Sequence, residues 1–240
     1  MRHLIEFAPA PAVLPPGRRV YAIGDVHGLD ERLAALHAAI GDDLAHRPCA
    51  APLLLHLGDY VDRGPDSRGV VARLVGGEPL PGIATVNLMG NHEQTMLDAL
   101  AGEGAAMTDW MINGGGAALR SWGGDPDAPR GTWVDAVPAG HLRFLHGLAL
   151  MHREGGYLFV HAGIRPGVAI AEQTRQDLLS IRQAFLYSEA DFGVVVVHGH
   201  TPKADPVLRA NRIGIDTGAV YGGRLTCAVL EDDRVGFLYA

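Results

Sequence analysis

Five short apolar runs in this chain each end beside a glycine in a block of Asp, His or Asn residues. Their length and their lack of charge predict buried strands. Ligands of α/β sheets bind outside the carboxyl ends of the strands, so we expect the five polar blocks to meet at one site. The runs are Val20–Ile23, Leu53–Leu57, Ile83–Met89, Tyr157–Val160 and Val194–Val197.

The segments between and after these runs predict the fold class. Helical patterns cover Asp30–Ile40, Ser67–Val75 and His92–Leu100, and strand–helix–strand order favours an α/β fold with right-handed crossovers. The last third is mostly β, which indicates a β-sandwich of two mixed sheets flanked by helices. Its expected strands are Val207–Leu208, Arg212–Ile215, Leu225–Leu230 and Val235–Tyr239.

The length of 240 residues, 48% of them apolar, suits one sizeable domain, which we place at residues 20–240. Residues 1–19 are interrupted by four prolines and form a predicted N-terminal Pro-rich extension without the pattern of a signal peptide. Residues 102–140 fit neither pattern and contain all three tryptophans. We expect a small inserted cap there, which either only buries its aromatic residues or also contacts substrate.

Bulk properties argue against several classes of protein. A net charge of −7 disfavours binding to nucleic acid. The chain has no uncharged apolar stretch of 18 residues, so no membrane span is predicted. The two cysteines, Cys49 and Cys227, make no CxxC pair, which argues against a disulfide framework or zinc–thiolate site and favours a cytoplasmic location. The sequence does not indicate an oligomeric state.

The residue types in the polar blocks suit a metal site. Carboxylate, imidazole and amide groups together bind divalent first-row metals, and the absence of cysteine argues against a soft structural site. The blocks are Gly24–Gly28, Gly58–Gly64, Gly90–Glu93, His161–Gly163 and His198–Thr201.

In one-letter code the blocks read GDVHG, GDYVDRG, GNHE, HAG and HGHT, in that order. They resemble the phosphoprotein phosphatases of the calcineurin-like metallophosphoesterase superfamily, and the resemblance extends from Gly24 to about Gly223. At roughly one in twenty per position, the six fixed residues of GDxVDRG recur by chance about once in 10⁷–10⁸ positions.

The resemblance implies a set of metal ligands. Asp25 and His27 would hold the first metal, and Asp59 would bridge both. Asn91, His161 and His200 would complete the second. Two divalent metal ions are therefore expected, with manganese first and iron or zinc as alternatives, and a hydroxide bridging them would attack phosphorus in line.

The resemblance also implies catalytic residues. His92 would be the general acid for the leaving oxygen, with Asp62 orienting its ring. Arg63 would bind the phosphate oxygens, and a second arginine is expected between the two late histidines. Arg182 fits that position best, and Arg165 and Arg175 compete with it.

Three further residues have plainer interpretations. His56 lies inside a predicted strand and is expected to be a hydrogen-bonded core residue. His198 is expected at a strand end or beside the ligands, because Pro202 stands where a GHxH pattern would have its second histidine. Asp216 is as well explained by a turn as by support of the ligand histidines.

The sequence leaves three functions to compare. The expected one is a protein serine/threonine phosphatase acting on a phosphoprotein or another small phosphorylated substrate. A diadenosine polyphosphate or nucleotide phosphohydrolase would use the same ligands. A non-catalytic scaffold on this fold is disfavoured, because every expected ligand and His92 are present.

Overall fold

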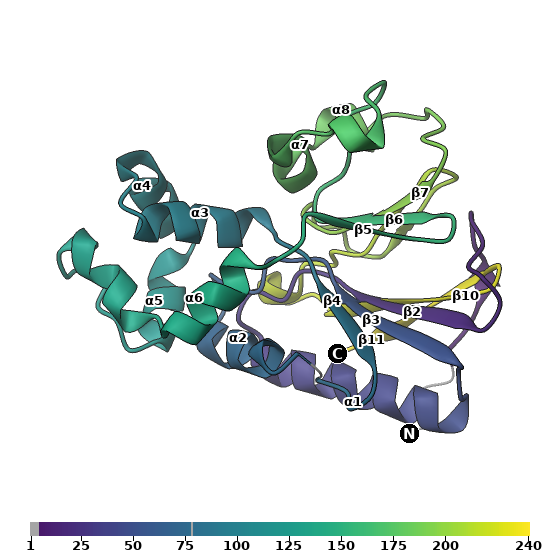
Figure 1. The fold of residues 1–240 in the computed structure, drawn as a ribbon, viewed down its shortest axis with the longest axis horizontal. Helices are drawn as coiled ribbons and strands as arrows, with labels where there is room; N and C mark the ends of the chain where they lie inside the picture. Colours follow the sequence, from purple (N-terminus) through teal and green to yellow (C-terminus); the bar gives the residue numbers. More distant parts are fainter. Residues whose placement is uncertain (1–4, 78) are drawn as a thin grey trace.

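The computed structural model describes residues 5–77 and 79–240 as two facing mixed β-sheets with helices outside both (Figure 1). The first sheet has the strand order β1-β11-β10-β2-β3-β4, and the second has the order β5-β6-β7-β9-β8. The predicted α/β sandwich of two mixed sheets is confirmed.

Each sheet combines parallel and antiparallel strands. In the first sheet β2, β3 and β4 run parallel, and β10 and β11 run antiparallel to their neighbours. In the second, β6, β7 and β9 run parallel, with β5 and β8 antiparallel at the two edges. In sheet order the strands are β1 (Ala8–Pro9), β11 (Arg234–Tyr239), β10 (Thr226–Glu231), β2 (Arg18–Ile23), β3 (Ala51–His56) and β4 (Ala84–Asn87), then β5 (Met151–Glu154), β6 (Tyr157–Val160), β7 (Val195–His198), β9 (Arg212–Gly214) and β8 (Val207–Leu208).

The central strands are apolar on both faces because each face packs on a different layer. In β2, Val20 and Ala22 face the other sheet, whereas Tyr21 and Ile23 face the outer helices. The same alternation occurs in β6, where Phe159 points between the sheets. Successive side chains point to opposite faces of a strand, so a continuous apolar run is what a strand covered on both sides requires.

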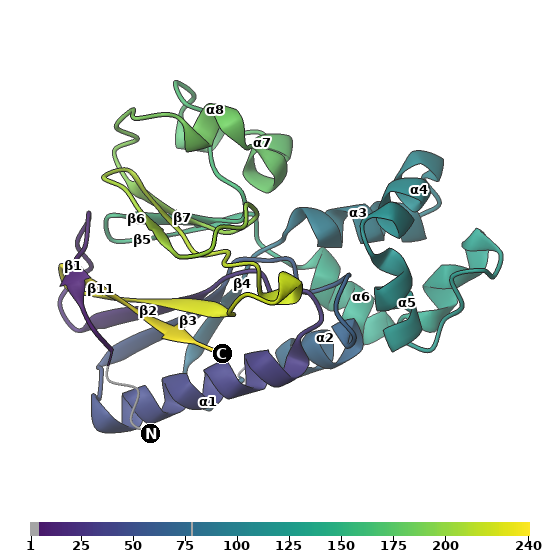
Figure 2. The same ribbon diagram turned by 180° about the vertical axis from the view of Figure 1, so that it is seen from behind.

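Helices cover the outer faces and form a group at one end. Figures 1 and 2 show α1 (Asp30–His46) along the first sheet, and α7 (Arg175–Ser180) and α8 (Gln183–Leu186) over the second. At one end lie α2 (Ser67–Val75), α3 (Asn91–Leu100), α4 (Gly104–Ile112), α5 (Gly115–Ser121) and α6 (Ala139–His146). Short 3-10 helices span Arg130–Ala136, Ile170–Glu172 and Ala219–Tyr221. Within the described ranges, no helix combines the length and the apolar character needed to cross a membrane.

In three segments the structure contains more than the sequence patterns predicted. Helix α1 continues six residues past Ile40, because Leu44 packs on the core and outweighs the cost of Gly41, about 1 kcal/mol in a helix. Before residue 20, β1 pairs with β11 and Leu14 is buried, while residues 1–4 lie outside the described part. Residues 102–140 form α4, α5 and a 3-10 helix and bury all three tryptophans.

Candidate metal centre

The five polar blocks meet where the carboxyl ends of the parallel strands of both sheets face each other. Asp25 and His27 follow β2, Asp59 follows β3, and His161 and His200 follow β6 and β7. Asn91 and His92 begin α3 just after β4. Asp25, His27, Asp59, His92, His161 and His200 are at most 6% exposed. The structure therefore brings the predicted ligands to one place, where all of them but the partly buried Asn91 are buried.

The backbone of these blocks is unusual. Among the described residues, six non-glycine residues have positive φ angles, and five of these six are predicted site residues. A non-glycine residue in this region is disfavoured and persists only where the surroundings hold it, which is typical of functional sites. The five are His27, Asp59, Asp62, Arg63 and His200.

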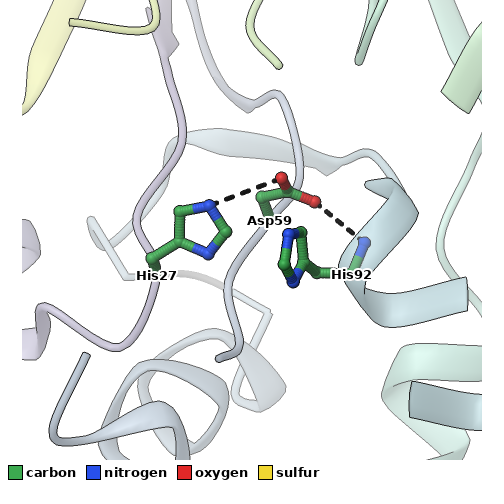
Figure 3. Close-up of side chains that lie close together, drawn as sticks. All are labelled: His27, Asp59 and His92. Atoms are coloured by element: carbon green, nitrogen blue, oxygen red, sulfur yellow. Dashed lines mark hydrogen bonds and ion pairs between the residues drawn. The ribbon is translucent and has the colours of Figure 1, made fainter. Parts of the chain in front are cut away.

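The first group of candidate ligands is His27, Asp59 and His92 (Figure 3). His27 Nδ1 donates to the Val61 carbonyl at 2.8 Å, which leaves Nε2 facing the Asp59 Oδ2 atom at 3.5 Å. The backbone amide of His92 donates to Asp59 Oδ1 at 3.1 Å. One ligand atom from each of the three residues lies within 4.8 Å of the others, so this group can hold one cation.

The second group shares Asp59 with the first and adds His161 and His200. His161 Nδ1 donates to the Leu57 carbonyl at 2.9 Å, and its Nε2 lies 3.4 Å from Asp59 Oδ1. The Asn91 Oδ1 atom lies 3.0 Å from His161 Nε2 and 2.8 Å from His200 Nδ1. Asp59 therefore lies between the two groups of candidate ligands, in the position that a carboxylate bridging two cations would occupy.

Asp25 lies in the same place but in neither group. Both of its carboxylate oxygens accept from the backbone amide of His200, at 3.0 and 3.1 Å. It lines one cavity with His27 and His200. Asp25 therefore contacts the backbone of His200, a residue of the second group, and shares the cavity with its predicted partner His27.

The chemistry of the donor atoms fits cations. The buried His200 Nε2 atom has no hydrogen-bond partner among residues 5–77 and 79–240. Burial lowers the pKa of His27 and that of His200 to about 3, so both rings are neutral near pH 7 and offer a lone pair.

The charges around His161 also favour a bound cation. Burial opposes a charge on this ring, but Asp59, Asp25 and Glu93 outweigh burial and raise the pKa of His161 to about 10. Several buried carboxylates therefore lie around one imidazole, and a buried negative charge of this kind needs a compensating cation. Divalent ions would supply it.

His92 and Asp62 form a hydrogen-bonded pair beside the first group. His92 Nδ1 donates to Asp62 Oδ2 at 2.7 Å, and Asp62 is completely buried. Burial opposes a proton on His92, but the Asp59 and Asp62 carboxylates outweigh it and raise the pKa of this ring. His92 is thus oriented as a general acid requires, and its closeness to Asp59 also makes it a candidate ligand.

A cavity of about 120 Å³ opens beside Asp25, His27 and His200. Arg63 and Arg182 line it together with Asp216 and the segment from Gly218 to Tyr221. Arg63 Nη1 donates to His27 Nε2 at 2.5 Å, so a cation on that nitrogen would displace this contact.

The two competing arginines are engaged elsewhere. Arg165 forms a two-pronged ion pair with Asp177, at 2.9 and 2.6 Å. Arg175 Nε donates to the Gln94 Oε1 atom at 2.6 Å. Arg182 is therefore the one of the three that lines the cavity with Arg63.

Glu93 stands in the GNHE block, and the sequence predicted no role for it. Its carboxylate is buried and accepts from four backbone amides, those of Gly90, Asp59, Tyr60 and Val61, at 2.7–3.1 Å. Burial and the Asp59 charge raise the pKa of Glu93 to about 7. Glu93 thereby shapes the turn that presents Asp59, and its only signal in the sequence was its place beside His92.

The close approach of Asp59 to the backbone at this turn explains why residue 90 is a glycine. A Cβ atom at Gly90 would lie 2.1 Å from the Asp59 Oδ1 atom. No real Cβ atom tolerates such a contact, so only glycine allows the Asp59 carboxylate to reach its place.

Comparison with known proteins agrees with this geometry. The family profile "Calcineurin-like phosphoesterase" matches residues 18–237. Serine/threonine-protein phosphatase 1 of Salmonella typhimurium is 30% identical, over 89% of this chain and 93% of that protein. A symmetrical bis(5'-nucleosyl)-tetraphosphatase of Acidovorax sp. is 27% identical, over 86% of this chain and 90% of that protein.

A solved structure provisionally named a diadenosine tetraphosphatase shares the fold. It is 21% identical to this chain, with a TM-score of 0.65 over 95% of this chain and 97% of that one. The matched profile, the sequence relatives and the buried His/Asp groups lead to one conclusion. The chain belongs to the calcineurin-like phosphoesterase family and is a metallophosphoesterase, a hydrolase of phosphate esters.

Proposed function

We propose that this metallophosphoesterase is a protein serine/threonine phosphatase that removes single phosphate groups with the help of two divalent metals, manganese first. The observation that carries the proposal is the placement of Arg63 and Arg182 along a small cavity beside Asp25, His27 and His200. Two guanidinium groups next to a cation-binding cluster suit one terminal phosphate. Similarity to the Salmonella phosphatase over nearly the whole of both chains supports the same choice.

Each side chain has a defined task in this proposal. His27, Asp25 and Asp59 would hold one cation, and Asp59, Asn91, His161 and His200 would hold the other. When bound, the pair supplies Lewis-acid stabilisation and acidifies the attacking water. Arg63 and Arg182 orient the phosphate oxygens.

His92 completes the reaction at the leaving group. The phosphorus–oxygen bond breaks with its electron pair on the leaving oxygen, which takes the proton from His92 Nε2. Asp62 holds the opposite ring nitrogen at 2.7 Å and so keeps Nε2 directed away from itself.

A dinucleotide substrate is the second candidate, because one exposed aromatic ring lies at the cavity. Tyr221 lines the cavity and is 65% exposed, and the Arg63 guanidinium lies 5.6 Å from the centre of its ring. An exposed ring beside a phosphate-binding arginine could stack on a nucleobase. Relatives named bis(5'-nucleosyl)-tetraphosphatases support this alternative.

Steady-state kinetics with manganese separates the two substrates. We expect a higher kcat/KM for a phosphoserine or phosphothreonine peptide than for diadenosine tetraphosphate. The Tyr221→Ala variant should then change kcat/KM for the peptide by less than about 3-fold, with Tyr221→Phe as the control that keeps the ring. A preference for the dinucleotide, lost in Tyr221→Ala and kept in Tyr221→Phe, would select the second candidate.

Metal analysis of the purified protein tests the cofactor. We expect two metal atoms per chain, with manganese restoring the highest activity after chelation and iron or zinc less. A cytoplasmic location is part of the proposal, because the chain has only two cysteines, Cys49 and Cys227, and they make no CxxC pair.

A further inference from the structure

We propose that the segment from Trp110 to Gly114 positions the catalytic groups Asp62 and Arg63, with Trp110 acting on His92 through Asp62. The inference rests on the proposed function, because it takes His92 as the general acid. It gives residues 102–140 a role in the chemistry, although none of them lines the cavity beside the candidate ligands.

Trp110 lies in the last turn of α4 and is fully buried. Its Nε1–H group donates to Asp62 Oδ1 at 2.8 Å, while Asp62 Oδ2 accepts from His92 Nδ1 at 2.7 Å. The two carboxylate oxygens are thus divided between the tryptophan and the histidine. Trp110, Asp62 and His92 form one chain of hydrogen bonds that ends at the candidate acid.

The position of Asp62 makes this contact important. Asp62 is 0% exposed, so in the intact protein its carboxylate depends on donors from the protein itself. A buried carboxylate that loses one partner turns toward another donor or takes up a proton, and either change would disturb its bond to His92. The indole N–H therefore fixes the carboxylate plane that in turn fixes the imidazole ring.

The same segment contacts the next residue along the chain. The carbonyl of Gly114 accepts from the backbone amide of Arg63 at 3.2 Å. Gly114 has a φ angle of +103°, and a Cβ atom there would lie 2.7 Å from the Arg63 nitrogen. Only glycine allows this approach, and the contact supports Arg63 in its own left-handed conformation at φ +67°.

Trp133 provides a matched control. It packs edge-on against Trp110, with 5.7 Å between ring centres, and it is 2% exposed. Its Nε1 atom is buried without a hydrogen-bond partner in the described part of the chain. A change from tryptophan to phenylalanine therefore removes similar volume at both positions but a hydrogen bond only at Trp110.

The test compares Trp110→Phe and Trp133→Phe on two aryl phosphates. Phenyl phosphate has a leaving group that needs a proton, whereas 2,4-dinitrophenyl phosphate has one that leaves without it. In Trp110→Phe we expect kcat to fall about 10-fold on phenyl phosphate, the effect of one hydrogen bond to a charged group, and less than about 3-fold on the dinitrophenyl ester. Metal content should stay at the wild-type value, and Trp133→Phe should keep the wild-type ratio of the two rates.

Equal losses on both esters in Trp110→Phe, or no loss, would overturn the inference. The His92→Asn variant separates this failure from that of the proposed mechanism. If His92→Asn affects both esters equally, the general-acid assignment fails as well. If His92→Asn selectively slows phenyl phosphate and Trp110→Phe does not, only the role of Trp110 is lost.

Discussion

Two groups of buried histidines in this protein differ in how their ring nitrogens are used. His37 on α1 and His56 on β3 contact each other, with 2.9 Å between their Nε2 atoms. His56 Nδ1 donates to the Asn87 Oδ1 atom at 2.8 Å. In the candidate metal centre, by contrast, His27 and His161 donate Nδ1–H to backbone carbonyls and direct Nε2 toward Asp59.

Burial alone does not separate the two groups. It lowers the pKa of His56 in the core to about 3, and that of His27 in the candidate metal centre to about 3 as well. The difference is the carboxylate shared by the second group. A histidine whose Nδ1 donates to the backbone and whose Nε2 faces a buried aspartate is oriented to bind a cation, whereas the hydrogen bonds of the core pair join only neutral groups, the two rings and Asn87.

The largest effect is expected for Asp59→Asn. This change removes the charge that both candidate metal groups share, so both cations should bind weakly. Activity should fall by at least about 10³-fold, as expected when a main source of transition-state charge stabilisation is lost. Metal analysis and phosphatase assays check this, and retention of two metals with normal kcat would contradict the bridging role.

The next effect is expected for His92→Asn. The side chain lies in one candidate metal group and also forms the pair with Asp62, so its two possible roles must be separated. As the general acid, its loss should lower kcat by roughly 10²–10⁴ with metal content largely unchanged. Loss of one metal per chain with full activity per remaining metal would assign it to the ligands instead.

A smaller effect on stability is expected in the core pair. In His37→Leu the His56 Nε2 atom loses its partner inside the protein, which should cost about 1–3 kcal/mol in the free energy of unfolding. Urea unfolding measures this cost. Metal content and kcat should stay unchanged, and a loss of metal would show that the two histidine groups are coupled.

The pH dependence of stability tests the same core pair. Burial lowers the pKa of His37 to about 4, so between pH 6.5 and 4 the unfolded chain binds a proton there that the folded protein does not. Stability from this residue is present above pH 6.5 and is lost as pH falls, at about 1.4 kcal/mol per pH unit for each such histidine. The His37→Leu variant should therefore have a shallower acid slope in urea unfolding, and an unchanged slope would contradict the neutral pair.

The candidate ligands could be located from the sequence because the information is local. Each of Asp25, Asp59, Asn91, His161 and His200 follows an apolar run within a few residues and stands in a block of fixed spacing. Strand ends in α/β folds lie at one edge, so the order of the blocks was sufficient to predict one site.

Other features depended on contacts between distant segments. Arg182 could be separated from Arg165 and Arg175 only when the partners of all three were known. Trp110 lies 48 residues from Asp62 along the chain, so no spacing rule could connect them.

By itself the sequence determined which chemical groups the centre contains and on which turns they stand, because residue types and local spacing are properties of the chain. Only the tertiary structure decided which sheet supplies each turn and what surrounds Glu93 and Asp62. The physical reason is that a buried carboxylate takes its donors from whatever the fold brings within 3 Å, and those donors come from segments far apart in the sequence.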